Sequence, residues 1–106
     1  MSRPINVTVL GSGSWGSTVA SLVARNAHTT VWTRSPLTLD QINNAHCNDV
    51  YLKGLKLHPE LRATLSMEEA LRDCDVLVIG VPSHSVRETL KAAAPLLRPW
   101  VPVISL

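Results

Sequence analysis

The feature that most constrains this chain is a glycine-rich turn close to its N-terminus. Residues 6–10, N-V-T-V-L, are mostly β-branched or apolar and predict a strand. Three glycines follow with the spacing G-x-G-x-x-G, at Gly11, Gly13 and Gly16, and residues 17–25 then predict a helix. A strand, a glycine turn and a helix in this order are the context in which the motif indicates dinucleotide binding.

Each glycine has a separate role in such a turn. Gly11 lets the chain leave the strand sharply, Gly13 leaves room for a pyrophosphate beside the backbone, and Gly16 lets the helix pack close to the strand. The N-terminus of the helix adds unpaired N–H groups and the positive end of its dipole. The alternative is a glycine-rich turn in an unrelated α/β protein. The rest of the sequence is needed to distinguish the two.

The downstream pattern predicts an α/β domain. Further strands are expected at residues 29–33, 61–65, 76–81 and 101–106, with helices between them and the last helix ended by Pro99. The connections are long enough for right-handed parallel crossovers. We therefore expect a Rossmann-type, doubly wound and mainly parallel sheet of about five strands in the order 3-2-1-4-5. Residues 11–16 and 81–85 should then face each other at the switch point.

The composition of the chain argues against several other classes of protein. The chain has 106 residues, enough for one small domain, and its ten basic and eight acidic residues are scattered, which argues against nucleic acid as a partner. No stretch reaches the roughly 20 apolar residues of a membrane span, and none suggests a signal peptide. Cys47 and Cys74 lack metal-ligand spacing, so we expect two reduced thiols, no metal site and a cytoplasmic location.

Arg34 follows the second expected strand, about twenty residues beyond the glycine turn. An acidic residue at this place would accept hydrogen bonds from the adenosine ribose of NAD. An arginine can instead neutralise a 2′-phosphate and stack on adenine. The site therefore takes NAD or NADP, with Arg34 favouring tolerance of NADP; a solvated arginine at a strand end is the alternative.

Four segments together resemble a known family. They are G-S-G-S-W-G, then V-W-T-R, then N-x-x-Y-L-x-G-x-x-L-x-P-x-L-x-A-T at residues 48–64, then D-V-L-V-I-G-V-P-S-x-x-V-R. This combination is similar to the N-terminal cofactor domain of bacterial NAD(P)-dependent glycerol-3-phosphate dehydrogenase. The tryptophan inside the turn and the segment 48–64 distinguish it from related dehydrogenases of 3-hydroxy acids and of 6-phosphogluconate.

The resemblance implies cofactor contacts at Ser14, Trp15 and Arg34, and a loop beside the adenosine and ribose at Val81, Pro82 and Ser83. Trp15 could instead be a packing residue at the helix start. Ser83 and Ser85 fit helix N-caps as well as ligands. Histidine as a residue type can act as a general acid near neutral pH, which makes His84 a candidate. However, it lies at a variable position of the family, and a histidine near a helix start is more often a surface group.

The resemblance covers only the N-terminal third of the family's usual length. Two residues depart from the family's pattern: Lys53 stands where the family usually has proline before the glycine, and His58 sits inside the usual Leu-Pro pair. Both lie in a loop where little should change. The family's Thr-Lys-Gly motif would come directly after Leu106, so we expect residues 1–106 to form the dinucleotide-binding domain, truncated before the helical substrate domain. No catalytic residue can be assigned.

These features favour a cofactor domain that binds dinucleotide without turning over substrate. The family reaction interconverts dihydroxyacetone phosphate and sn-glycerol 3-phosphate with NAD(P)H, for phospholipid biosynthesis. Two alternatives stay open. One is a non-catalytic module that binds dinucleotide or pairs with itself or a completing chain through an exposed fifth strand. The other is the domain of a related 3-hydroxy acid dehydrogenase.

Overall fold

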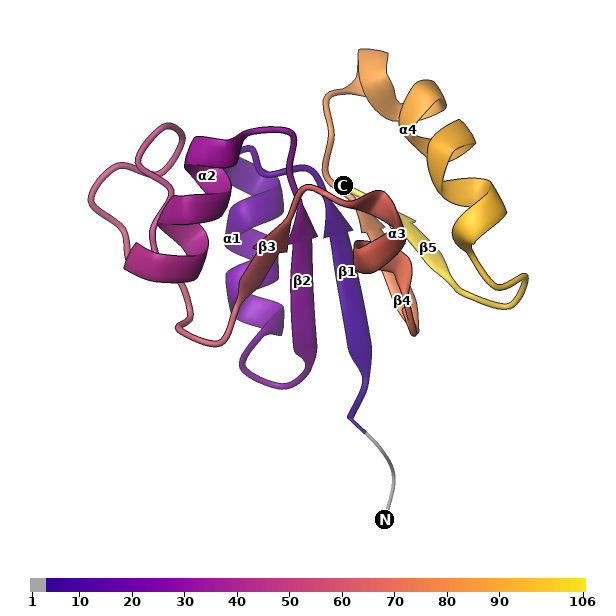
Figure 1. Cartoon of the computed structure of the whole chain (residues 1–106), viewed down its shortest axis with the longest axis horizontal. Coiled ribbons are helices and arrows are strands. Elements are labelled where there is room, and N and C mark those ends of the chain that lie inside the picture. The colour runs from indigo at the N-terminus through magenta and orange to yellow at the C-terminus, as the bar shows by residue number, and fades with distance from the viewer. Residues whose placement is uncertain (1–3) are drawn as a thin grey trace.

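A five-stranded parallel sheet forms the centre of the molecule (Figure 1). The computed structural model describes residues 4–106. The sheet comprises β1 (Asn6–Leu10), β2 (His28–Trp32), β3 (Arg62–Thr64), β4 (Val76–Ile79) and β5 (Val103–Ser105). Its order is β3-β2-β1-β4-β5, and every neighbouring pair is parallel. The expected fold class and strand order are thereby confirmed.

Helices cover both faces of the sheet. They are α1 (Ser14–Val23), α2 (Pro36–Asp40), α3 (Met67–Leu71) and α4 (Val86–Ala93). A π-helical turn, η1 (Gln41–Ala45), extends α2, and the 3₁₀ turns η2 (Ser83–Ser85) and η3 (Ala94–Leu96) flank α4. In Figure 1, α1 lies behind the sheet and α3 lies in front of it. None of the helices within residues 4–106 is long and apolar enough to cross a membrane.

Alternation along the strands produces two hydrophobic cores. Val7 and Val9 of β1 point to the face covered by α1 and η1, where they pack with Ala20 and Ile42. Leu10, from the other face of β1, packs instead with residues of α3, β4 and α4, among them Leu71, Leu77, Ile79 and Ala93. A strand that is buried on both faces belongs at the centre of a doubly wound sheet.

The ends of several elements differ from those expected. The strand expected at 76–81 ends at Ile79, and Gly80 and Val81 already belong to the loop that follows. The last helix ends at Ala93 rather than at Pro99. Pro95 explains this early end, because a proline lacks the N–H that would continue the helix and its ring clashes with the preceding turn. The expectation that Pro99 stops the helix was therefore wrong.

Candidate cofactor-binding cleft

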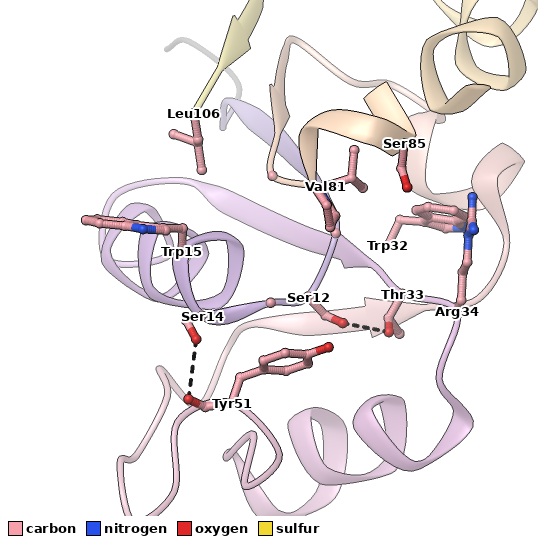
Figure 2. A pocket seen from close by; sticks show the side chains of 14 residues that line it. Ser12, Ser14, Trp15, Trp32, Thr33, Arg34, Tyr51, Val81, Ser85 and Leu106 are labelled. Atoms are coloured by element: carbon pink, nitrogen blue, oxygen red, sulfur yellow. Dashed lines mark hydrogen bonds between the residues drawn. The ribbon is translucent and has the colours of Figure 1, made fainter. Parts of the chain in front are cut away.

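A cleft of about 510 Å³ opens at the carboxyl ends of the strands (Figure 2). Its walls come from the turn after β1, the residues after β2 and the residues after β4, which is where open α/β sheets bind ligands. The lining residues are Gly11, Ser12, Gly13, Ser14, Trp15, Trp32, Thr33, Arg34, Tyr51, Gly80, Val81, Pro82, Ser85 and Leu106.

The glycine turn touches the end of β4 backbone to backbone. Gly11 has a φ of +111°, and a Cβ there would lie 2.8 Å from the carbonyl carbon of Gly80. A Cβ on Gly16 would lie 2.5 Å from the carbonyl oxygen of Gly11. By contrast, a Cβ on Gly13 would have no protein atom within 4 Å. Gly11 and Gly16 are thus required by the fold, whereas Gly13 leaves open space in the cleft.

Hydrogen bonds fasten the turn to β2. The Gly11 amide donates to the carbonyl oxygen of Trp32 at 2.9 Å. The hydroxyls of Ser12 and Thr33 are 2.8 Å apart and hydrogen-bonded (Figure 2). The helix α1 begins at Ser14, and no side chain caps it. The N–H groups of its first turn are therefore available to donate hydrogen bonds to an anion.

Arg34 lies over the ring of Trp32, with its guanidinium carbon 5.3 Å from the ring centroid. The ring itself is held in place, because Trp32 is 9% exposed and its Nε1 donates to the carbonyl oxygen of Leu65 at 3.1 Å. Arg34 is exposed on its other side and borders the cleft. The geometry therefore offers a positive charge, supported by an aromatic ring, to a ligand at the end of β2.

Most of the residues expected to contact a cofactor come together in this cleft. They are Gly11, Gly13, Ser14, Trp15, Arg34, Val81 and Pro82. Gly16 is buried beneath the turn, and Ser83 is exposed beside a shallow groove along α4. Trp15 is 75% exposed and so is not a packing residue at the helix start. His84 is exposed and does not line the cleft, while Ser85 occupies the N-cap position of α4 without a capping hydrogen bond.

Several lining residues were not anticipated from the sequence. Ser12, Thr33 and Trp32 stand directly beside predicted residues, so their position next to the turn and at a strand end was an available signal. Tyr51 was not signalled by local pattern, because it lies in the long connection between η1 and β3. Its backbone carbonyl accepts a hydrogen bond from Ser14 Oγ at 3.4 Å, and the residue, which is 55% exposed, borders the cleft (Figure 2).

Comparison with known proteins agrees with this geometry. Residues 6–106 match the family model described as NAD-dependent glycerol-3-phosphate dehydrogenase N-terminus. The chain belongs to this family. Among curated relatives, a glycerol-3-phosphate dehydrogenase [NAD(P)+] 2 of Sphingopyxis alaskensis is 51% identical over 102 residues, covering 96% of this chain and 31% of the relative. A glycerol-3-phosphate dehydrogenase [NAD(P)+] 1 of Mycobacterium tuberculosis is 50% identical over 105 residues, covering 98% of this chain and 31% of the relative.

Solved structures of glycerol-3-phosphate dehydrogenases share the fold. The enzyme from Saccharomyces cerevisiae superimposes with a TM-score of 0.89 at 27% identity, covering 97% of this chain and 33% of that one. The enzyme from Plasmodium falciparum superimposes with a TM-score of 0.87 at 27% identity, covering 96% of this chain and 32% of that one. This NAD(P)-binding domain thus spans about a third of the length of the dehydrogenases that it matches.

Within residues 4–106, no group of three or more His, Cys, Asp or Glu residues is placed to hold a metal ion.

Proposed function

We propose that this chain binds NAD(H) or NADP(H) in the cleft and is the cofactor domain of an enzyme that interconverts dihydroxyacetone phosphate and sn-glycerol 3-phosphate. The observation that carries the proposal is the open space at Gly13, directly at the uncapped start of α1. A pyrophosphate fits there because it can approach the backbone and accept from its N–H groups. The relatives that match the chain are named as NAD(P)+-dependent enzymes of this reaction.

The remaining walls fit the other parts of a dinucleotide. Arg34, stacked on Trp32, would meet the adenosine ribose and neutralise a 2′-phosphate where one is present. Trp15 would close over the turn, and Val81 and Pro82 would border the nucleoside from the β4 side. When bound, the cofactor supplies the hydride chemistry, and the protein holds and orients it. Two free thiols, Cys47 and Cys74, fit the cytoplasmic location that we expect.

The chain alone should bind dinucleotide without reducing dihydroxyacetone phosphate. It spans about a third of the length of its relatives, and we assign no residue of the described cleft to proton transfer or to substrate phosphate. Isothermal titration with NADPH and NADH tests the binding. Oxidation of NADPH in the presence of dihydroxyacetone phosphate, followed at the nicotinamide absorbance, tests the turnover. Absence of binding would refute the proposed function, and turnover by this chain would refute the restriction to binding.

The outer edge of β5 favours one further candidate, an interaction role. Val103 and Ile104 are 48% and 50% exposed on a strand whose only described neighbour is β4. An exposed, apolar edge of this kind pairs readily with another strand. Light scattering coupled to size-exclusion chromatography distinguishes the roles, because a cofactor-bound monomer would count against pairing. The 3-hydroxy acid dehydrogenase alternative is disfavoured by the match to the glycerol-3-phosphate dehydrogenase family.

A further inference from the structure

A buried asparagine outside the glycine motif is hydrogen-bonded to the turn. Asn48 lies in the connection between η1 and β3, and its exposed fraction is 0%. Its Nδ2 donates to the carbonyl oxygen of Ser12 at 2.7 Å and to Oγ of Ser17 at 2.9 Å. Ser17 Oγ in turn donates to the same Ser12 oxygen at 2.9 Å. The Ser12 carbonyl therefore accepts from two side chains that are also bonded to each other.

The chemistry of the partners fixes which way the Asn48 amide faces. A carbonyl oxygen only accepts, so the group that meets Ser12 must be the amide NH₂. The other arm, Oδ1, is buried and has no hydrogen-bond partner among the described residues. Burying an amide oxygen without a partner is unfavourable. The hydrogen bonds of this side chain thus go to the turn, at Ser12, and to α1, at Ser17, and neither joins it to its own segment.

Holding the Ser12 carbonyl also orients the next amide. The peptide between Ser12 and Gly13 is planar and trans, so its C=O and N–H point in opposite directions. The C=O is directed to the buried Asn48 and Ser17, and the N–H of Gly13 is therefore directed away from them. Gly13 borders the cleft, where even an added Cβ would meet no protein atom within 4 Å.

We propose that Asn48 is a positioning residue for pyrophosphate binding, because it keeps the Ser12–Gly13 peptide in the orientation that presents its N–H to the phosphate oxygens. This inference rests on the proposed function, since the pyrophosphate is that of the bound dinucleotide. It gives the segment 48–64 a role beyond connecting two elements. The bond from Ser14 Oγ to the Tyr51 carbonyl joins the same segment to the turn a second time.

A pair of matched variants tests the proposal. Asn48→Leu removes the hydrogen bond to the Ser12 carbonyl and the hydrogen bond to Ser17 Oγ. Asn43→Leu is the control, because Asn43 also makes two hydrogen bonds, donating to the carbonyl of Ala63 at 3.0 Å and accepting from its amide at 2.7 Å, but both hold β3. Each variant is titrated with NADPH and with adenosine 2′-monophosphate, which carries the adenosine but no pyrophosphate.

Asn48→Leu should weaken NADPH binding by about tenfold or more and leave the affinity for adenosine 2′-monophosphate within about twofold. Asn43→Leu should change neither affinity, although both variants lower the melting temperature. An equal loss for the two ligands, or no loss for NADPH, would overturn the proposal. If Asn48→Leu does not fold, Ser17→Ala serves instead; it leaves one of the two bonds to Ser12, and we expect a loss of about threefold for NADPH alone.

A second measurement separates this inference from the proposed function. If the parent chain binds neither NADPH nor NADH, the proposed function fails. The positioning role is then decided by ¹⁵N relaxation of the Gly13 amide without ligand. That amide should be ordered in the parent and in Asn43→Leu, and mobile on the nanosecond timescale in Asn48→Leu. Unchanged order at Gly13 in Asn48→Leu would overturn the role of Asn48.

Discussion

The two sides of the cofactor cleft are held by different means. On the β1–β2 side, the turn is held by hydrogen bonds. The Gly11 amide donates to the Trp32 carbonyl, Ser12 and Thr33 share a hydroxyl bond, and Asn48 donates to the Ser12 carbonyl. On the β4 side, residues 80–85 have few such bonds. The Gly80 amide donates to the carbonyl of Leu10 at 2.8 Å, and the Ser85 amide donates to that of Pro82 at 2.8 Å.

The difference follows from what each side has to provide. Phosphate is recognised by N–H groups whose directions must be set before the ligand arrives, so the turn needs a rigid frame. The β4 side mainly bounds the cleft with the carbon surfaces of Val81 and Pro82, which demand less exact placement. The sides come close together where Gly80 lies against Gly11 and Gly16.

The largest effect is expected at that contact. Gly11→Ala adds a Cβ 2.8 Å from the Gly80 backbone at a φ of +111°. A left-handed backbone costs about 1–2 kcal/mol and overpacking about 1–3 kcal/mol, so we expect a total loss of about 3 kcal/mol in the free energy of unfolding. Chemical denaturation measures the loss. Gly54→Ala is the control, because its φ is +81° but its Cβ meets no atom within 4 Å. A loss no greater than that of the control would mean that the two sides do not touch as described.

Gly13→Val should separate binding from folding. Gly13 has a φ of −69° and open space around its Cβ position, so valine fits the folded chain. The same side chain would occupy the pyrophosphate space. We expect NADPH binding to weaken by about a hundredfold or more, roughly 2.7 kcal/mol, with a change of less than about 0.5 kcal/mol in unfolding free energy. Calorimetric titration and denaturation give both values, and retained affinity would remove the turn as the phosphate site.

The parts of this fold that could be predicted are those encoded locally. The motif at Gly11, Gly13 and Gly16 and the β-branched runs predict β1, β2 and β4, and the doubly wound architecture that the motif indicates then predicts the strand order. Asn48 could not be assigned in this way, because its partner Ser12 is 36 positions away in the sequence. The periodicity of hydrophobic residues, which predicts helices and strands, carries no information on a hydrogen bond between residues so far apart in the sequence.

The direction in which individual side chains point was the other feature that could not be predicted from the sequence. Ser83 and Ser85 are both small and polar and flank His84, so the sequence does not distinguish them. They lie in the 3₁₀ turn η2, in which successive residues rotate by about 120° around the axis. Ser85 consequently lines the cleft, whereas Ser83 borders the groove along α4.

Arg34→Asp should alter cofactor preference more than affinity as a whole. Arg34 borders the cleft on the fixed β2 side and is supported by Trp32. Replacing its charge removes the partner of a 2′-phosphate and introduces an acceptor for ribose hydroxyls. We expect the ratio of NADPH to NADH affinity to fall by about tenfold. Titration of both cofactors measures the ratio. Arg25→Asp is the charge-matched control, because Arg25 lies in the turn after α1 and outside the cleft. An unchanged ratio would leave Arg34 without a role in choosing the cofactor.

The smallest effect is expected on the β4 side. Ser85→Ala removes a hydroxyl that lines the cleft and makes no capping bond to α4, so we expect NADPH affinity to fall by about threefold, or about 0.7 kcal/mol, with little change in stability. Ser83→Ala is the paired variant and should change neither quantity, because that side chain lies outside the cleft. If Ser83→Ala weakens NADPH as much as Ser85→Ala, the β4 loop must rearrange around the cofactor. In that case the β1–β2 side of the cleft would be in place before the cofactor binds, whereas the β4 side would take its final form only when the cofactor binds.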